Sequence, residues 1–210
     1  MLLVGNLNSP FVRRVAVSLN ALQIPFELKL LIVSKQPQAV REFNPLVRIP
    51  VLTLDDGEVL IDSSAILDEI DQIVGPERAL VPPSGPMRRD VLRICSLALG
   101  AMEKTMWALY ERRFRPPEKV HEPWIERNDQ QVLGGLRFLD GVASKRKPDD
   151  WLVGDRMTQA DITSCVAYRF AALNRPALNL SEQVPHLAAF AARCERLQMF
   201  MASPMPPPTL

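Results

Sequence analysis

Three short segments in the first third of the sequence carry residues that could bind a small charged ligand. The first is Ser9–Pro10, which follows the apolar run 2–4 and precedes an amphipathic stretch. At such a strand-to-helix junction, unpaired backbone N–H groups and the helix dipole favour an anion, and the Ser9 hydroxyl could donate a hydrogen bond to a bound thiolate. An ordinary helix N-cap is the alternative interpretation, because serine is a preferred cap residue.

The second segment is 44–52, Asn-Pro-Leu-Val-Arg-Ile-Pro-Val-Leu, in which Pro50 begins a predicted strand. A proline is compatible with a strand when its missing donor faces an edge. If the Ile49–Pro50 peptide bond is cis, the backbone of Ile49 turns outward and can pair with an extended peptide as an added strand would. Most X–Pro bonds are trans, so this segment alone is a weak indicator of binding.

The third segment is Asp62-Ser63-Ser64, at the start of a predicted helix. A carboxylate and a hydroxyl at this position could hold the head group of an amino acid. Asp62 would bind the ammonium, and the Ser63 hydroxyl would bind the carboxylate together with the N–H groups of the helix. A plain N-cap is again the alternative.

Strands and helices are predicted to alternate on either side of these three segments. Apolar runs bounded by turn residues predict strands, and apolar residues at helical spacing predict helices. Asp55-Asp56-Gly57 between two apolar runs predicts a hairpin, and strand-helix-strand at the start predicts a parallel pair. We expect strands at 2–4, 26–33, 51–54 and 58–61, and helices at 10–23, near 37–43, and from Asp62 through Ile73.

The segment 75–86 contains four prolines and two glycines and is predicted to be a linker. Beyond it only helical periodicity is found, so we expect an all-helical second domain. The predicted domains are 1–75, a linker at 76–86, and 87–210. The predicted helices run from Met87 to before Pro116, over 125–139, from Thr158, and from about Val184 to Met201, and the tail 204–210 is predicted to be irregular.

In this order and at these spacings, the segments resemble the cytosolic glutathione transferase family. The stretch 9–19, Ser-Pro-Phe-Val-Arg-Arg-Val-Ala-Val-Ser-Leu, is similar to serine-type bacterial and plant members. Residues 44–52 fit Asn-Pro-x-x-x-x-Pro-Val-Leu, and 62–66 fit Asp-Ser-x-Ala-Ile. In the second domain, 154–162 resembles the family's capping segment, with Thr158 as N-cap and an aspartate three residues later. The resemblance covers nearly the whole chain.

The resemblance implies a thioredoxin-like domain with the order β-α-β-α-β-β-α, followed by a helical bundle. It implies that Ser9 stabilises the thiolate of glutathione, the co-substrate, for attack on an electrophile that is expected to be hydrophobic. It also implies a homodimer with a role in detoxification, with Arg13, Arg14 and the third-helix face as possible dimer contacts, for which solvated charges are the alternative. The implied glutathione contacts are Phe11, Arg48, Ile49, Pro50, Asp62 and Ser63. The implied electrophile site contains Trp107, Tyr110 and Arg113; helix packing is the alternative for Trp107 and Tyr110.

Two other functions are compatible with the same fold. One is a non-catalytic binding or interaction protein, although such relatives often lose the activating residue. The other is a specialised glutathione-dependent dehalogenase or isomerase. Redox chemistry at position 9 would need a sulfur nucleophile, and serine stands there.

Composition excludes several classes of function. The net charge is +1 and basic residues are dispersed, so no nucleic-acid partner is expected. We expect no membrane span, because no run of about 18 apolar residues exists, and no signal peptide, which points to the cytoplasm. Three widely spaced cysteines are expected to be buried thiols, and two separate histidines predict no metal site.

Overall fold

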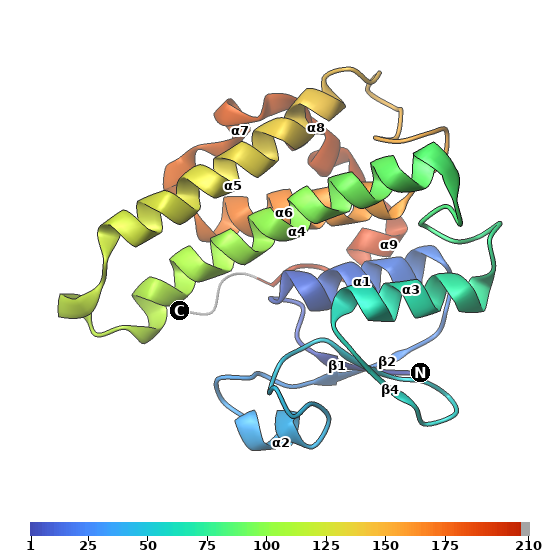
Figure 1. The fold of residues 1–210 in the computed structure, drawn as a ribbon, viewed down its shortest axis with the longest axis horizontal. Helices are drawn as coiled ribbons and strands as arrows, with labels where there is room; N and C mark the ends of the chain where they lie inside the picture. The colour runs from blue at the N-terminus through green and yellow to red at the C-terminus, as the bar shows by residue number, and fades with distance from the viewer. Residues whose placement is uncertain (207–210) are drawn as a thin grey trace. The chain divides into compact units, whose positions relative to one another are not determined.

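The computed structural model describes residues 1–206, which group into two compact units. Unit 1 comprises residues 1–83 together with the described residues from Arg196 onward, and unit 2 comprises residues 84–195. The predicted tail falls partly on residues 207–210, which lie outside the described part of the chain. Figure 1 shows the labelled elements.

Unit 1 is built on a four-stranded mixed sheet with the strand order β2-β1-β3-β4. The first two strands are parallel, as predicted, and β3 runs antiparallel to both β1 and β4. Two helices pack side by side on one face of the sheet, and a short helix lies on the other (Figure 1). The bounds are β1 Leu2–Gly5, α1 Pro10–Ala21, β2 Glu27–Leu30, α2 Pro37–Arg41, β3 Val51–Thr53, β4 Val59–Ile61 and α3 Ser63–Val74. This order confirms the predicted fold class.

The two central strands of the sheet, β1 and β3, are buried on both faces, and side chains of one strand alternate between these faces. Val4 and Val51 are paired across β1 and β3 and pack with Val40 of α2. Their neighbours Leu3 and Leu52 are also paired, fully buried, and face α1 and α3. The register of β1 and β3 is therefore fixed by packing on both faces, which also fixes where the loops that leave their ends begin.

Two arginines that we expected to be dimer contacts or solvated charges are buried inside unit 1, so that expectation is wrong. Arg13 is fully buried: its Nε donates to the carbonyl of Ser203 at 2.9 Å, and its guanidinium lies 5.8 Å from the ring centroid of Phe200. Arg14 is 2 % exposed, and its Nη1 donates to Ser63 Oγ at 3.2 Å. Both partners are distant in sequence, so a local pattern could not reveal them.

The C-terminal segment differs from its prediction in the same region. We expected one helix from about Val184 to Met201, within the helical domain. The structure has α8 Pro185–Cys194, a break, and then the single turn α9 Gln198–Met201. Contacts to Arg13 and Asn20 place this last turn in unit 1, since Asn20 Nδ2 donates to the carbonyl of Met199 and to Ser203 Oγ.

Unit 2 is a helical bundle in which α4 packs along both α5 and α6. The long helices lie where the periodicity predicted them. Gly135 on α5 faces α4 closely: a Cβ at this position would lie 3.3 Å from the carbonyl oxygen of Leu97. The bounds are α4 Gly85–Phe114, α5 Glu122–Ala143, α6 Gln159–Asn174, α7 Leu180–Gln183, α8 as above, and the 3₁₀ turns η1 Pro117–Lys119 and η2 Pro176–Leu178. None of the described helices could cross a membrane.

Candidate functional site

The register of the sheet brings the three predicted binding segments to one edge. Val4 of β1 pairs with Val51 of β3, and Val51 pairs with Ile61 of β4. Because β3 runs antiparallel to both neighbours, its start lies beside the carboxyl ends of β1 and β4. The connections at this edge are 6–9, 48–50 and 62–64, which we call the candidate edge. They contain Ser9, Arg48, Ile49, Pro50, Asp62 and Ser63.

Ser9 is the N-cap of α1 and is partly buried. Its Oγ accepts a hydrogen bond from the N–H of Val12 at 3.4 Å, which is long for such a bond. A hydroxyl that accepts retains its own O–H for donation. The cap and the proposed donation to a thiolate are therefore compatible. Phe11, in the first turn of α1, is also partly exposed.

Ile49 and Pro50 lie against the end of β1. Their peptide bond is cis; Pro50 is buried, as is Gly5, and Ile49 is partly exposed. A Cβ at Gly5 would lie 2.5 Å from Val12 Cγ2 and 3.3 Å from Ile49 Cβ, so only glycine lets these segments meet. Among the described residues, no hydrogen bond uses the backbone N–H or carbonyl of Ile49.

The loop before Ile49 is held by a buried asparagine. Asn44 is 2 % exposed; its Nδ2 donates to the carbonyl of Arg48 at 2.9 Å, and its Oδ1 accepts from the N–H of Leu46 at 2.9 Å. Arg48 itself is exposed. The backbone of this loop is therefore fixed by a side chain, while the Arg48 side chain reaches solvent.

Asp62 and Ser63 occupy different environments at the start of α3. Asp62 is exposed, has a φ of 69°, and caps the helix: its Oδ1 accepts from the N–H of Ser64 at 2.8 Å. Ser63 is 2 % exposed, and its hydroxyl accepts from Arg14. The Asp62 carboxylate therefore faces solvent, while the Ser63 hydroxyl is backed by a buried cation.

The residues predicted for the second substrate lie on one helix of unit 2. Trp107, Tyr110 and Arg113 are all exposed on α4, at 49 % for the tryptophan. Phe114 belongs with them: it is 58 % exposed, and its ring packs edge to face on Tyr110 with the centroids 5.0 Å apart. Phe114 was not predicted from the sequence, although its position four residues after Tyr110 places both rings on one helix face.

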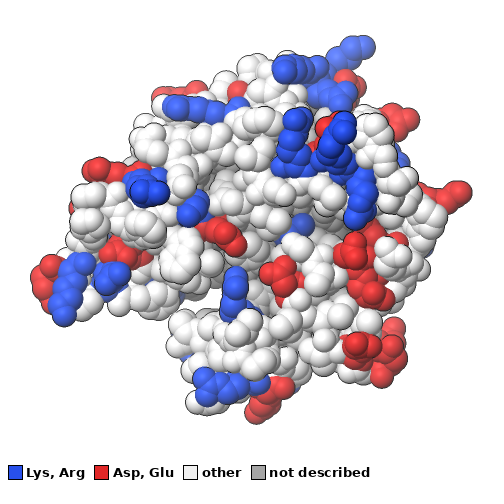
Figure 2. Space-filling model, in the orientation of Figure 1, with Lys and Arg blue, Asp and Glu red and all other residues white. Residues whose placement is uncertain are grey.

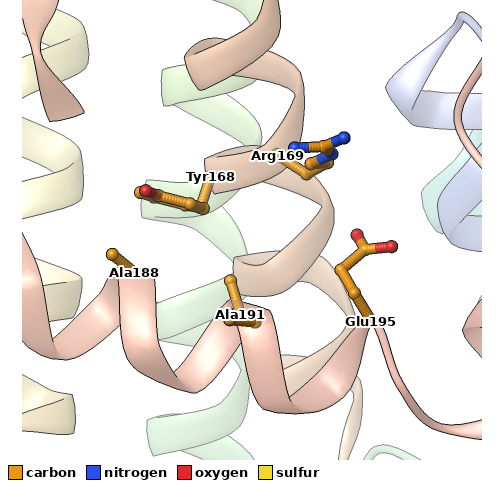
Figure 3. A pocket seen from close by; sticks show the side chains of 6 residues that line it. Tyr168, Arg169, Ala188, Ala191 and Glu195 are labelled. Carbon is orange, nitrogen blue, oxygen red and sulfur yellow. The ribbon is translucent and has the colours of Figure 1, made fainter. Parts of the chain in front are cut away.

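A cavity of about 380 Å³ lies between α6 and α8 of unit 2 and contains none of the predicted residues. Figure 3 shows Arg169 of α6 and Glu195 on one side of this cavity and Tyr168 and Ala188 on the other. Burial raises the pKa of the Tyr168 phenol in this cavity. The lining carries no nucleophile with an adjacent base. It is lined by Tyr168, Arg169, Ala188, Ala191, Ala192 and Glu195.

The cysteines and the other metal-ligating residue types form no candidate metal site among residues 1–206. All three cysteines are buried and remain thiols. Within residues 1–206, no three His, Cys, Asp or Glu side chains are grouped so that they could hold a metal ion. Acidic and basic side chains are interspersed over the face shown in Figure 2.

A thioredoxin-like unit that presents a capping serine, a cis-proline loop and an acidic helix start at one edge, followed by a helical bundle, defines a two-unit glutathione transferase architecture. The model of the glutathione S-transferase N-terminal domain matches residues 3–78, and the model of the C-terminal domain matches residues 102–198. The chain therefore belongs to the glutathione S-transferase family.

Three relatives illustrate the similarity. An uncharacterized GST-like protein, YibF, from Escherichia coli K12 is 29 % identical over 187 residues, covering 89 % of this chain and 90 % of that protein. A glutathione S-transferase from Methylobacterium radiotolerans, in complex with glutathione sulfonate, has a TM-score of 0.90 at 28 % identity and covers 100 % of this chain and 96 % of its own. A family member from Pseudomonas fluorescens Pf-5, with bound S-(propanoic acid)-glutathione, has a TM-score of 0.83 at 29 % identity over 100 % of both chains.

Proposed function

We propose that this protein is a glutathione transferase that binds glutathione at the candidate edge and holds its sulfur as a thiolate. The thiolate attacks an electrophilic carbon: the carbon–sulfur bond forms as the bond to the leaving group breaks, and that group, such as the halide of an aryl halide, departs with the electron pair. The thiol proton has already passed to solvent. The observation that carries the proposal is the convergence of Ser9, Ile49 and Asp62 at one sheet edge. The relatives that bind glutathione derivatives support it.

Ser9 and its helix can supply the required activation without a general base. A free thiol has a pKa of about 8.5, so little of it is ionised at neutral pH. Lowering that pKa by about two units requires roughly 2.7 kcal/mol of preferential thiolate binding. A hydrogen bond to a charged group contributes about 1.5–3 kcal/mol, and a helix terminus adds about 0.3–1 kcal/mol. The two together match the requirement.

The other groups at the candidate edge suit the rest of the tripeptide. The backbone of Ile49 can pair with the backbone of glutathione, since its hydrogen-bonding groups have no partner in the described chain. Asp62 can bind the ammonium. The Ser63 hydroxyl can donate to the carboxylate, with Arg14 behind it to stabilise the negative charge. Phe11, Arg48 and Pro50 are proposed to line the same site.

A direct test separates this function from the non-catalytic alternative. The purified protein is passed over glutathione resin and then assayed for conjugation of glutathione to a generic aryl halide. Retention with turnover is expected. Retention without turnover would favour a binding protein or a specialised dehalogenase or isomerase, and no retention would contradict the proposal.

The electrophile site is proposed to favour substrates that combine an apolar body with an anionic group. Trp107, Tyr110 and Phe114 supply aromatic surface on α4. Arg112 is paired with Glu122 at 2.7 Å and Arg115 with Glu111 at 2.6 Å. Arg113 has no acidic partner among the described residues, so its charge is not neutralised. The Pseudomonas relative binds a glutathione derivative that carries a propanoic acid.

Arg113→Gln is expected to lower kcat/KM for a carboxylate-bearing aryl halide by about three- to fivefold. This loss corresponds to the free energy that an exposed ion pair contributes. The uncharged aryl halide should be affected little, because it does not use the guanidinium. Arg112→Gln, which removes a neighbouring cation already paired with Glu122, is the matched control and should preserve the preference. Equal losses for both substrates in Arg113→Gln would contradict the assignment.

We also propose that the protein acts as a cytoplasmic homodimer in detoxification. Support for a partner surface comes from apolar side chains exposed on β4 and α3 of unit 1: Val59 is 45 % exposed, Ile61 36 % and Ile73 49 %. Light scattering coupled to gel filtration should give twice the chain mass of 23.6 kDa. Ile73→Glu is expected to shift the protein to a monomer, and a wild-type monomer at micromolar concentration would contradict the dimer.

A further inference from the structure

We propose that Asn6 is a positioning residue for Ser9, an inference that rests on the proposed function and extends it. Asn6 is the first residue after β1, and no binding role was predicted for it. All of its acceptor groups, and its side-chain donor, are used to shape or anchor the turn 6–9 that precedes the capping serine. The turn is the only stretch of chain between the sheet and Ser9.

The hydrogen bonds around Asn6 define the turn. The carbonyl of Asn6 accepts from the N–H of Ser9 at 3.1 Å. Its side-chain Oδ1 accepts from the N–H of Asn8 at 3.1 Å. An asparagine side chain that bonds the N–H two residues on forms an Asx turn, which restrains the backbone as a second turn bond would. Asn6 therefore holds the N–H of Ser9 and the N–H of Asn8, the residue before it.

The same side chain ties the turn to the core of unit 1. Asn6 Nδ2 donates to the carbonyl of Leu31 at 3.3 Å, and the N–H of Leu31 donates to the carbonyl of Gly5 at 3.2 Å. Leu31 is 5 % exposed and packs with Val4 and Val51. The amide thus extends the pairing of β1 and β2 past the end of the sheet and fixes the turn to a buried residue.

This anchoring matters because the Ser9 hydroxyl must be placed correctly to stabilise the thiolate. A hydroxyl stabilises a thiolate only within hydrogen-bond distance, and a displacement of about 1 Å can cost about 100-fold in rate. The cap bond of Ser9 to Val12 is long, so it restrains the serine weakly. On its helical side the Ser9 backbone is held by its carbonyl, which accepts from the N–H of Arg13 at 2.9 Å, and the Asn6 turn holds the backbone on the sheet side. The turn therefore helps to place the hydroxyl without a contact between Asn6 and glutathione being needed.

The test measures the thiol pKa of bound glutathione, from the ultraviolet absorbance of the thiolate, in Asn6→Ala, Ser9→Ala and the double variant. Asn6→Ala is expected to raise this pKa by about half a unit to one unit and to lower kcat about tenfold, with KM for glutathione within about twofold. The double variant should show no larger pKa shift than Ser9→Ala alone, because Asn6 acts through Ser9. If Asn6 only stabilised the fold, its effect on the thiol pKa would not depend on the presence of the Ser9 hydroxyl.

Two further variants keep the result interpretable. Asn20→Ala removes another partly exposed asparagine of unit 1, one bonded to Met199 and Ser203, and should leave the thiol pKa unchanged. Asn6→Ser keeps a weaker turn acceptor but cannot reach Leu31, and an intermediate pKa is expected from it even if Asn6→Ala folds poorly. A wild-type pKa in both Asn6 variants, or additive shifts in the double variant, would overturn the inference alone. Failure of the wild-type protein to bind glutathione would overturn the proposed function as well.

Discussion

Ser9→Ala is expected to raise the thiol pKa of bound glutathione by about one to two units and to lower conjugation at neutral pH about 10- to 100-fold. The reason is the loss of a hydrogen bond to a charged sulfur, which contributes about 1.5–3 kcal/mol. The helix terminus remains, so activation is reduced but not abolished. At saturating glutathione, the pH–rate profile of kcat/KM for the electrophile should move to higher pH by the same interval, because it then reports the ionisation of the enzyme–glutathione complex.

Ser9 is also a helix cap, so the loss of activity must be separated from a loss of stability. Ser9→Gly removes the hydroxyl but costs only a few tenths of a kcal/mol as a cap, whereas Ser9→Ala costs about 1 kcal/mol. Both variants should lose activation to the same extent, and only Ser9→Ala should melt at a lower temperature. A pH–rate profile that stays at the wild-type position in either variant would show that the hydroxyl does not hold the thiolate.

Asp161→Ala is expected to lower the free energy of unfolding by at least about 1 kcal/mol, as lost caps do, and by up to about 3 kcal/mol because buried donors lose their acceptor. Asp161 is fully buried, and its carboxylate accepts from the N–H of Leu152 at 2.7 Å, from the N–H of Thr158 at 2.7 Å, and from Thr158 Oγ1 at 2.9 Å. It closes the capping box of α6 and joins the preceding loop to it.

Two opposing influences act on the ionisation of the Asp161 carboxylate. Burial raises the pKa of Asp161, because it disfavours the ionised carboxylate, and the three donors counteract that shift. The melting temperature of Asp161→Ala should be lower than that of the wild type by about 2–12 °C, which corresponds to a loss of about 1–3 kcal/mol. Asp155→Ala removes an exposed carboxylate from the same loop and should melt like the wild type. A melt of Asp161→Ala that is unchanged from the wild type would refute the capping role.

The parts of the structure that the sequence predicted best are those set by neighbouring residues. The caps at Ser9, Asp62 and Thr158 were readable because a cap and the helix it begins lie within four residues. Hydrophobic periodicity, which is also a property of neighbouring residues, predicted the order of elements in unit 1 and the long helices of unit 2. Position and type of these elements then followed, with differences of a few residues at their ends.

The parts that could not be predicted depend on residues far apart in the sequence. Arginine is expected at the surface, so the burial of Arg13 was visible only once Phe200 and Ser203 were seen to cover it. The break between α8 and α9 has the same origin, since the last turn binds α1 instead of continuing the bundle. The role of Asn6 could not be predicted from the sequence, because its partner Leu31 lies 25 residues away, just after the neighbouring strand β2.

The central claim is that the Ser9 hydroxyl holds the sulfur of bound glutathione as a thiolate. Calorimetric titration with glutathione at about pH 7.5, in buffers of different ionisation enthalpy, tests it most directly because it counts the protons released on binding. The wild-type protein should release close to one proton per glutathione bound, since a thiol of pKa about 8.5 becomes ionised. Ser9→Ala should release much less. Binding to the wild type without proton release, or no binding at all, would contradict the claim.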